Sequence, residues 1–122
     1  MGGAYVILLR VRSVLRVDIR GTPVALPPGR YAYVGSALAG IAARVRRHRQ
    51  VACRLRAPAR WHLDKVLTHP SVHWLAAVPL PGASECALAH RLAMLPGVNV
   101  PIPGFGATDC RAGCPAHFLR LP

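Results

Sequence analysis

Frequent prolines limit this chain to short elements of secondary structure. Its 122 residues include 12 prolines, most of which stand between apolar segments and mark turns. Proline has no backbone N–H and a fixed φ, so it ends helices and is excluded from central strands. The length suits one domain over residues 1–122. The order of segments, mostly β first, then α, β, α and a short final β, predicts a small α/β sandwich rather than a bundle or a barrel.

The apolar patterns predict where the strands lie. Residues 4–10 are apolar on both faces, as is typical of a central strand. Residues 15–19 and 24–26 flank a turn and predict a hairpin. Residues 30–35 predict a further strand, with Tyr31 and Tyr33 on one face. Residues 72–78 are β-like, and residues 117–121 suggest an edge strand.

Three helices are expected from apolar residues at helical spacing, over residues 38–50, 59–69 and 85–95. Ser36 and Ser84 are placed to cap the first and the third of them. The buried stripe of the first helix is expected to comprise Leu38, Ile41, Ala42 and Val45.

The charge of the chain is strongly one-sided. Sixteen Lys and Arg stand against four Asp and Glu, which gives a net charge of +12. Such a surface is typical of a polyanion binder, with nucleic acid the first candidate, an anionic membrane surface the second and plain solvation the alternative. Apart from Arg44, the basic stretch over residues 44–60 holds six candidate phosphate contacts: Arg46, Arg47, Arg49, Arg54, Arg56 and Arg60.

The same composition bears on where the protein works. No apolar run approaches the roughly 20 residues that a membrane span needs. The N-terminal stretch lacks the pattern of a secretory signal. We therefore expect a soluble intracellular protein and, with nucleic acid the first candidate, no membrane partner.

Several polar residues have spacing that suggests chemistry. Arg44 and His48 lie four residues apart and share a helix face. Glu85 is in line with the apolar stripe of the third helix, so its carboxylate is partnered, functional or simply favoured by the helix dipole. Tyr5 and Tyr33 lie on strands expected to be neighbours, where satisfied, half-buried hydroxyls are the plainer alternative. Asp64 is expected to pair with an arginine of the basic stretch.

The four cysteines allow three interpretations. The spacing Cys110-x3-Cys114-x2-His117 is typical of a metal site, and Cys86 could supply a fourth ligand for a structural zinc ion. A Cys110–Cys114 disulfide would require an oxidising setting or a thermophile. Reduced thiols without a metal are the remaining alternative.

Two tripeptides carry a resemblance to a known superfamily. Gly3-Ala4-Tyr5 opens the first strand, Tyr33-Val34-Gly35 closes a later one, and Arg44, His48 and Glu85 follow in order. This pattern resembles the GIY-YIG nucleases. One uncharacterised branch of that superfamily is similar over nearly the whole chain, through segments such as Leu26-Pro27-Pro28-Gly29-Arg30, Trp61-His62-Leu63-Asp64 and Gly104-Phe105-Gly106-Ala107-Thr108-Asp109-Cys110.

The resemblance implies a mainly antiparallel sheet flanked by helices, and hydrolysis of a phosphodiester with one divalent ion. By position, Glu85 would ligate Mg²⁺ or Mn²⁺, and Arg44 would grip the scissile phosphate. Tyr5 would act as general base or orient the attacking water, with nearby positive charge needed to lower its pKa. Tyr33 would orient water or phosphate, and His48 would assist the phosphate or Tyr5.

The resemblance also bears on partners. Many members of the superfamily carry an asparagine about 12 residues after the metal-binding glutamate, and here Asn99 stands nearby at +14. Some relatives are joined to DNA-repair glycosylase-like domains, which favours DNA over RNA, a repair partner and a nucleoid-associated cytoplasmic location. The alternative function is a non-catalytic nucleic-acid-binding or accessory module that uses the same fold.

Overall fold

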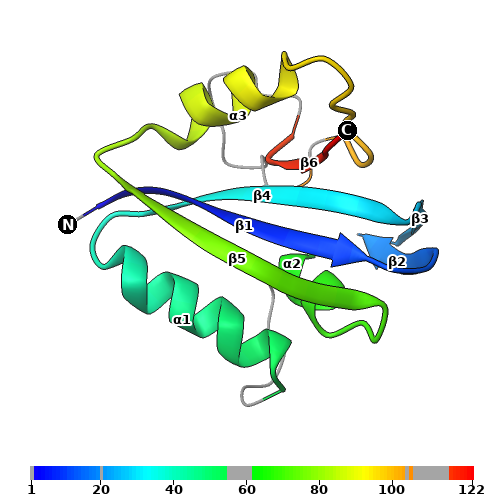
Figure 1. Cartoon of the computed structure of the whole chain (residues 1–122). Coiled ribbons are helices and arrows are strands. Elements are labelled where there is room, and N and C mark those ends of the chain that lie inside the picture. The colour runs from blue at the N-terminus through cyan, green and yellow to red at the C-terminus, as the bar shows by residue number, and fades with distance from the viewer. Residues whose placement is uncertain (1, 20, 55–61, 104, 106–115) are drawn as a thin grey trace.

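The fold is a mixed α/β arrangement around a four-stranded antiparallel sheet. The computed structural model describes residues 2–19, 21–54, 62–103, 105 and 116–122. The strand order is β5-β1-β4-β6 (Figure 1), with these bounds: β1 Gly3–Val11, β4 Gly29–Ala37, β5 Val72–Pro81 and β6 Phe118–Arg120. The mainly antiparallel sheet and the inner position of β1 confirm the prediction from the sequence.

A small second sheet is formed by the predicted hairpin of β2 (Leu15–Ile19) and β3 (Thr22–Leu26). Its turn is held by the N–H of Gly21, which donates to Asp18 Oδ1 over 2.7 Å. Gly21 has φ +80°, a left-handed conformation that glycine adopts without steric cost. The turn therefore depends on the glycine as well as on the carboxylate.

Helices cover both faces of the larger sheet. The helices α1 (Ile41–Ala52) and α2 (His62–Leu67) lie on one face, and α3 (Glu85–Ala93) lies on the other (Figure 1). The alternation of β1 separates the two cores, since Tyr5 and Ile7 belong to the large core under α1 and α2. Val6 instead packs in a smaller core with Ala89 of α3.

The predicted start of the first helix was wrong. Ser36 does not cap α1, because it lies in β4, where it pairs with Ala4 of β1. The helix begins after Gly40, which has φ +79° and makes no side-chain cap. Leu38, predicted to be buried, is fully exposed. Continued pairing with β1 outweighs the local capping signal of the serine.

The other helix and strand predictions differ mainly at their ends. Ser84 caps α3 as predicted, since its Oγ accepts a hydrogen bond from the N–H of Ala87 over 3.3 Å. β5 extends to Pro81, because it pairs with β1 along the full length of that strand. No helix in the described part of the chain is long and apolar enough to cross a membrane.

Candidate functional site

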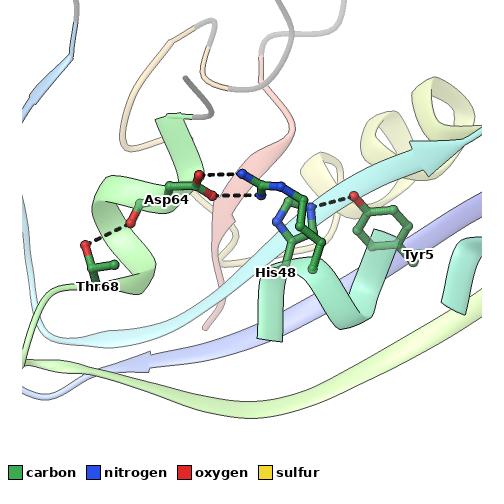
Figure 2. Close-up of polar contacts among 5 residues, drawn as sticks. Tyr5, His48, Asp64 and Thr68 are labelled. Carbon is green, nitrogen blue, oxygen red and sulfur yellow. Dashed lines mark hydrogen bonds and ion pairs between the residues drawn. The ribbon is translucent and has the colours of Figure 1, made fainter. Parts of the chain in front are cut away.

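Three aromatic rings form a cluster on the α1 face of the sheet. The Tyr5 hydroxyl and His48 Nε2 are joined by a hydrogen bond of 2.9 Å (Figure 2). Ring centroids lie 6.4 Å apart for Tyr5 and Tyr33, and 6.0 Å apart for Tyr33 and His48. All three side chains are buried. The structure thus brings together three of the five residues predicted to be catalytic.

Glycine at position 35 makes room for this cluster. Tyr5 pairs with Gly35 across β1 and β4, and the tyrosine ring lies over that glycine. A Cβ at position 35 would stand 2.6 Å from Tyr5 Cε2 and closer still to Cζ and the hydroxyl oxygen. A side chain there would displace the ring from His48, so the glycine of the second tripeptide has a direct steric role.

Burial sets the protonation of the three rings. It raises the pKa of the Tyr5 hydroxyl well above that of a free phenol, and the Arg44 guanidinium offsets this only in part. Burial also raises the pKa of Tyr33. It lowers the pKa of His48 to about 4, and the charge of Arg47 adds to this effect. At neutral pH the tyrosines are therefore protonated and the imidazole is neutral.

A buried ion pair anchors the helix that carries His48. Arg47 Nη1 and Nη2 donate to the two carboxylate oxygens of Asp64 over 3.1 and 2.8 Å. The Asp64 side chain is fully buried. Its backbone carbonyl also accepts from the Thr68 hydroxyl over 2.9 Å. This confirms the expectation that Asp64 pairs with an arginine of the basic stretch, and it fixes α1 to α2.

Arg44 and Glu85 approach the cluster from opposite sides of the sheet. The positive charge of Arg44, on α1, lowers the pKa of Tyr5 against the larger effect of burial. Glu85, in the first turn of α3, raises the pKa of both Tyr5 and Tyr33 through its negative charge. The charges of Arg44 and Glu85 thus both act on Tyr5 and Tyr33, although α1 and α3 cover different faces.

Glu85 also belongs to a second cluster of polar side chains. Its Oε1 lies 3.2 Å from Nδ1 of His117, while Cys86 Sγ lies 3.9 Å from Nε2 of the same ring. Single donor atoms of the three residues all lie within 4.8 Å of one another. Of the zinc ligands predicted from the sequence, Cys86 and His117 are thus neighbours, and Cys110 and Cys114 lie outside the described residues.

The residues present fit one hard cation at Glu85. The carboxylate is 24% exposed, and Mg²⁺ is commonly held by one or two carboxylates with water and phosphate completing its shell.

Asn99, considered as a further site residue, is exposed and pairs through its backbone with Arg120 of β6. The structure gives it no contact with the cluster.

The arginines of the basic stretch divide into two groups. Arg47 and Arg54 hold the fold, the latter by donating to the Thr68 carbonyl over 2.8 Å. Arg46 and Arg49 are exposed, and the Arg49 guanidinium lies 5.3 Å from the centre of the Trp74 ring. The remaining two predicted contacts, Arg56 and Arg60, lie outside the described residues.

A cavity at the far end of the sheet was not predicted from the sequence. Its volume is about 750 Å³, and four arginines line it: Arg10, Arg12, Arg30 and Arg120. The described residues that line it include no Asp or Glu. Arg10 and Arg30 face each other across β1 and β4, an arrangement of like charges that destabilises a sheet unless an anion compensates it. Only the register in which β1 pairs with β4 could have revealed that these arginines lie together.

The fold and these side chains define a small antiparallel α/β protein with a basic surface and a tyrosine–histidine cluster on its sheet. The chain belongs to the family described as Domain of unknown function DUF123, whose model matches residues 4–122. No curated protein and no solved structure matches it.

Proposed function

We propose that this protein hydrolyses phosphodiester bonds in DNA, in the manner of the GIY-YIG nucleases and with the help of Mg²⁺ or Mn²⁺. The observation that carries the proposal is the hydrogen bond between Tyr5 and His48, beside Arg44 and within the field of Glu85. These residues come from three elements far apart in sequence. They are the residue types that the resemblance to that superfamily requires.

The hydrogen bond gives the proton of the Tyr5 hydroxyl an acceptor, and because the pKa of His48 is about 4, that acceptor is a weak base and the transfer is uphill. In hydrolysis the oxygen of water forms a bond to phosphorus, and the bond from phosphorus to the leaving oxygen breaks. Tyr5 would take the proton of the water while giving its own to Nε2 of His48, which is neutral at working pH. This requires the tautomer of His48 that carries its proton on Nδ1. The leaving oxygen takes a proton from solvent.

Because the pKa of Tyr5 is raised, a relay through His48 is favoured over a mechanism in which Tyr5 is ionised before the reaction. A phenol kept protonated by burial cannot accept a proton unless it releases its own, so His48 supplies the basic atom. Arg44 would hold the phosphate with its planar guanidinium and offset the charge that develops there. A divalent ion at Glu85 would act as a Lewis acid on the phosphoryl oxygen.

The basic surface supports DNA as the substrate. The exposed Arg46 and Arg49 lie on the helix that carries Arg44 and His48, so phosphates held there would lie near the cluster. The arginine-lined cavity adds further phosphate contacts at the other end of β1 and β4. We place the activity in DNA repair or processing, in the nucleoid-associated cytoplasm and with a repair protein as partner.

A cleavage assay with matched variants tests the proposal. Supercoiled, single-stranded, flapped and branched DNA, with matching RNA, would be incubated at low salt with Mg²⁺, Mn²⁺ or a chelator. The expected result is metal-dependent cutting of DNA that is lost in Glu85→Gln and Arg44→Ala and reduced at least 100-fold in Tyr5→Phe.

Tyr31→Phe is the control for the tyrosine. Tyr31 lies on the same face of the sheet, but its hydroxyl donates to the Pro27 carbonyl over 2.6 Å and is not part of the cluster. Arg91→Ala removes an exposed arginine from α3 and is the control for charge. Equal losses in Tyr5→Phe and Tyr31→Phe would contradict the relay, and an absence of cutting in every metal would contradict the nuclease.

A non-catalytic nucleic-acid-binding module is the second candidate function, and the arginine-lined cavity favours it. That cavity is lined by residues of β1, β4 and β6 that are distant from Tyr5 along the strands. Binding of this kind needs no ion, and it would be unchanged or tighter in Glu85→Gln, because a negative charge is removed. Tight binding without cleavage would therefore select this function.

A further inference from the structure

We infer that Glu85, Cys86 and His117 form a binding centre for a single zinc-like transition-metal ion. The inference goes beyond the proposed function, because a zinc-like ion on these three donors is a different occupant of the carboxylate that Mg²⁺ or Mn²⁺ would use in cleavage. It depends on the proposed function only through Glu85, which belongs to both the metal centre and the nuclease site. The binding of the ion is a property of the protein without DNA.

The geometry of the three donors suits a tetrahedral ion. Bonds of about 2.0 Å to nitrogen or oxygen and about 2.3 Å to sulfur place such ligands about 3.3 to 3.6 Å apart. An imidazole offers an ion only one of its nitrogens: through Nδ1, His117 has Glu85 Oε1 at 3.2 Å, and through Nε2 it has Cys86 Sγ at 3.9 Å. Because all three donor atoms lie within 4.8 Å, closing on an ion requires movements of about 1 Å.

The backbone holds these donors in place. His117 is fully buried, its N–H donates to the Phe105 carbonyl over 2.8 Å, and its own carbonyl accepts from the N–H of Val34 over 2.8 Å. Both neighbours of the imidazole ring belong to the first turn of α3, which Ser84 caps. A site on a capped helix and on a segment held by two backbone hydrogen bonds needs little reorganisation to bind an ion.

The kinds of donor decide which ion binds. Thiolate sulfur and imidazole nitrogen favour zinc and similar transition metals, whereas Mg²⁺ requires oxygen ligands and gives up water reluctantly. Glu85 is 24% exposed. Among the described residues the centre therefore has three protein ligands, and the partly exposed Glu85 leaves one side of them accessible to solvent.

Titration with Co²⁺ tests this inference, because cobalt occupies zinc sites and reports its ligands by colour. Reduced protein, freed of metal with a chelator, would be titrated with Co²⁺ in the absence of DNA. We expect one equivalent to bind with a thiolate-to-cobalt charge-transfer band and the strong visible absorption of a tetrahedral ion. One equivalent of Zn²⁺ should abolish both, and a large excess of Mg²⁺ should abolish neither.

Matched variants identify the ligands. In Cys86→Ser the charge-transfer band should be lost, and in Glu85→Gln the affinity for Co²⁺ should fall at least tenfold while the band remains. Cys53→Ser is the control, since Cys53 is an exposed cysteine at the end of α1. Circular dichroism would verify that Cys86→Ser and Glu85→Gln fold. No band in the wild type, or an unchanged band in Cys86→Ser, would overturn the inference.

The two proposals fail separately in these experiments. A protein that binds Co²⁺ as expected but cuts no DNA keeps the metal centre and loses the nuclease. A protein that cuts DNA with Mg²⁺ but shows no charge-transfer band keeps the nuclease, and the Glu85–His117 contact is then an ion pair beside a thiol that binds no metal.

Discussion

Replacing Gly35 by alanine tests the steric basis of the tyrosine–histidine cluster. The new Cβ would stand 2.6 Å from Tyr5 Cε2, whereas ordinary contacts begin at 3.4 Å, so the ring must move by about 1 Å. The hydrogen bond to His48 is 2.9 Å long, and a displacement of that size would break it. Gly35 does not have a positive φ, so the backbone itself tolerates alanine.

Two costs combine in this variant. Overpacking of a buried ring costs about 1–3 kcal/mol, and separating a buried hydroxyl from its partner costs about 1–3 kcal/mol more. We expect Gly35→Ala to lower the free energy of unfolding by about 3 kcal/mol, which corresponds to a melting temperature lower by ~10 °C in a domain of this size. Cleavage should fall as far as it does in Tyr5→Phe.

A double-mutant cycle isolates the cause. Tyr5→Leu removes Cζ, Cε2 and the hydroxyl, which are the atoms that the new Cβ would meet. In that background Gly35→Ala should cost less than about 1 kcal/mol, measured by urea unfolding. Ser36→Ala, an exposed change in the same strand, is the control and should be neutral. Equal costs of Gly35→Ala with and without the Tyr5 ring would refute the steric argument.

Three further predictions concern charge. Asp64→Asn breaks the buried pair with Arg47 and should lower the free energy of unfolding by about 3 kcal/mol in urea. Arg10→Ala combined with Arg30→Ala should weaken DNA binding and reduce the slope of log K against log salt by about 2 in titrations, without loss of stability, because the two charges repel across the strands. Burial lowers the pKa of His48 to about 4, from an ordinary value of 6.5. The free energy of unfolding should therefore be highest above pH 6.5 and fall by about 3 kcal/mol as the pH drops towards 4, because the unfolded chain binds the proton more readily. In His48→Gln that loss should be absent from pH-dependent melting curves.

The sequence predicted the sheet better than it predicted the ends of elements. Apolar and alternating runs are local signals, so β1, the hairpin and the shared face of Tyr31 and Tyr33 could be recognised. The boundary near Ser36 could not, because pairing of that residue with Ala4 is a contact between distant segments. A serine before a helical pattern predicts a cap even where that serine pairs with a neighbouring strand.

The same distinction holds for the candidate site. Helical spacing placed Arg44 and His48 on one ridge, and the basic stretch indicated that Asp64 would find a partner among its arginines. The choice of Arg47 for that pair depends on how α1 packs on α2, which no local pattern encodes. The arrangement of Glu85 and Cys86 around His117 depends on the position of a strand more than 30 residues further along the chain.

Groups from both faces of the sheet lie near the point where the described pairing of β6 with β4 begins. β4 continues to Ala37, but in the described part of the chain β6 pairs only with Tyr31–Tyr33. His117 lies just before β6 and reaches the α3 side, where it contacts Glu85 and Cys86. The negative charge of Glu85 nevertheless acts on Tyr5 and Tyr33, which belong to the core on the α1 side. Under the proposed function, a phosphate held between these groups would therefore meet the proposed proton relay from one face and the carboxylate of Glu85 from the other.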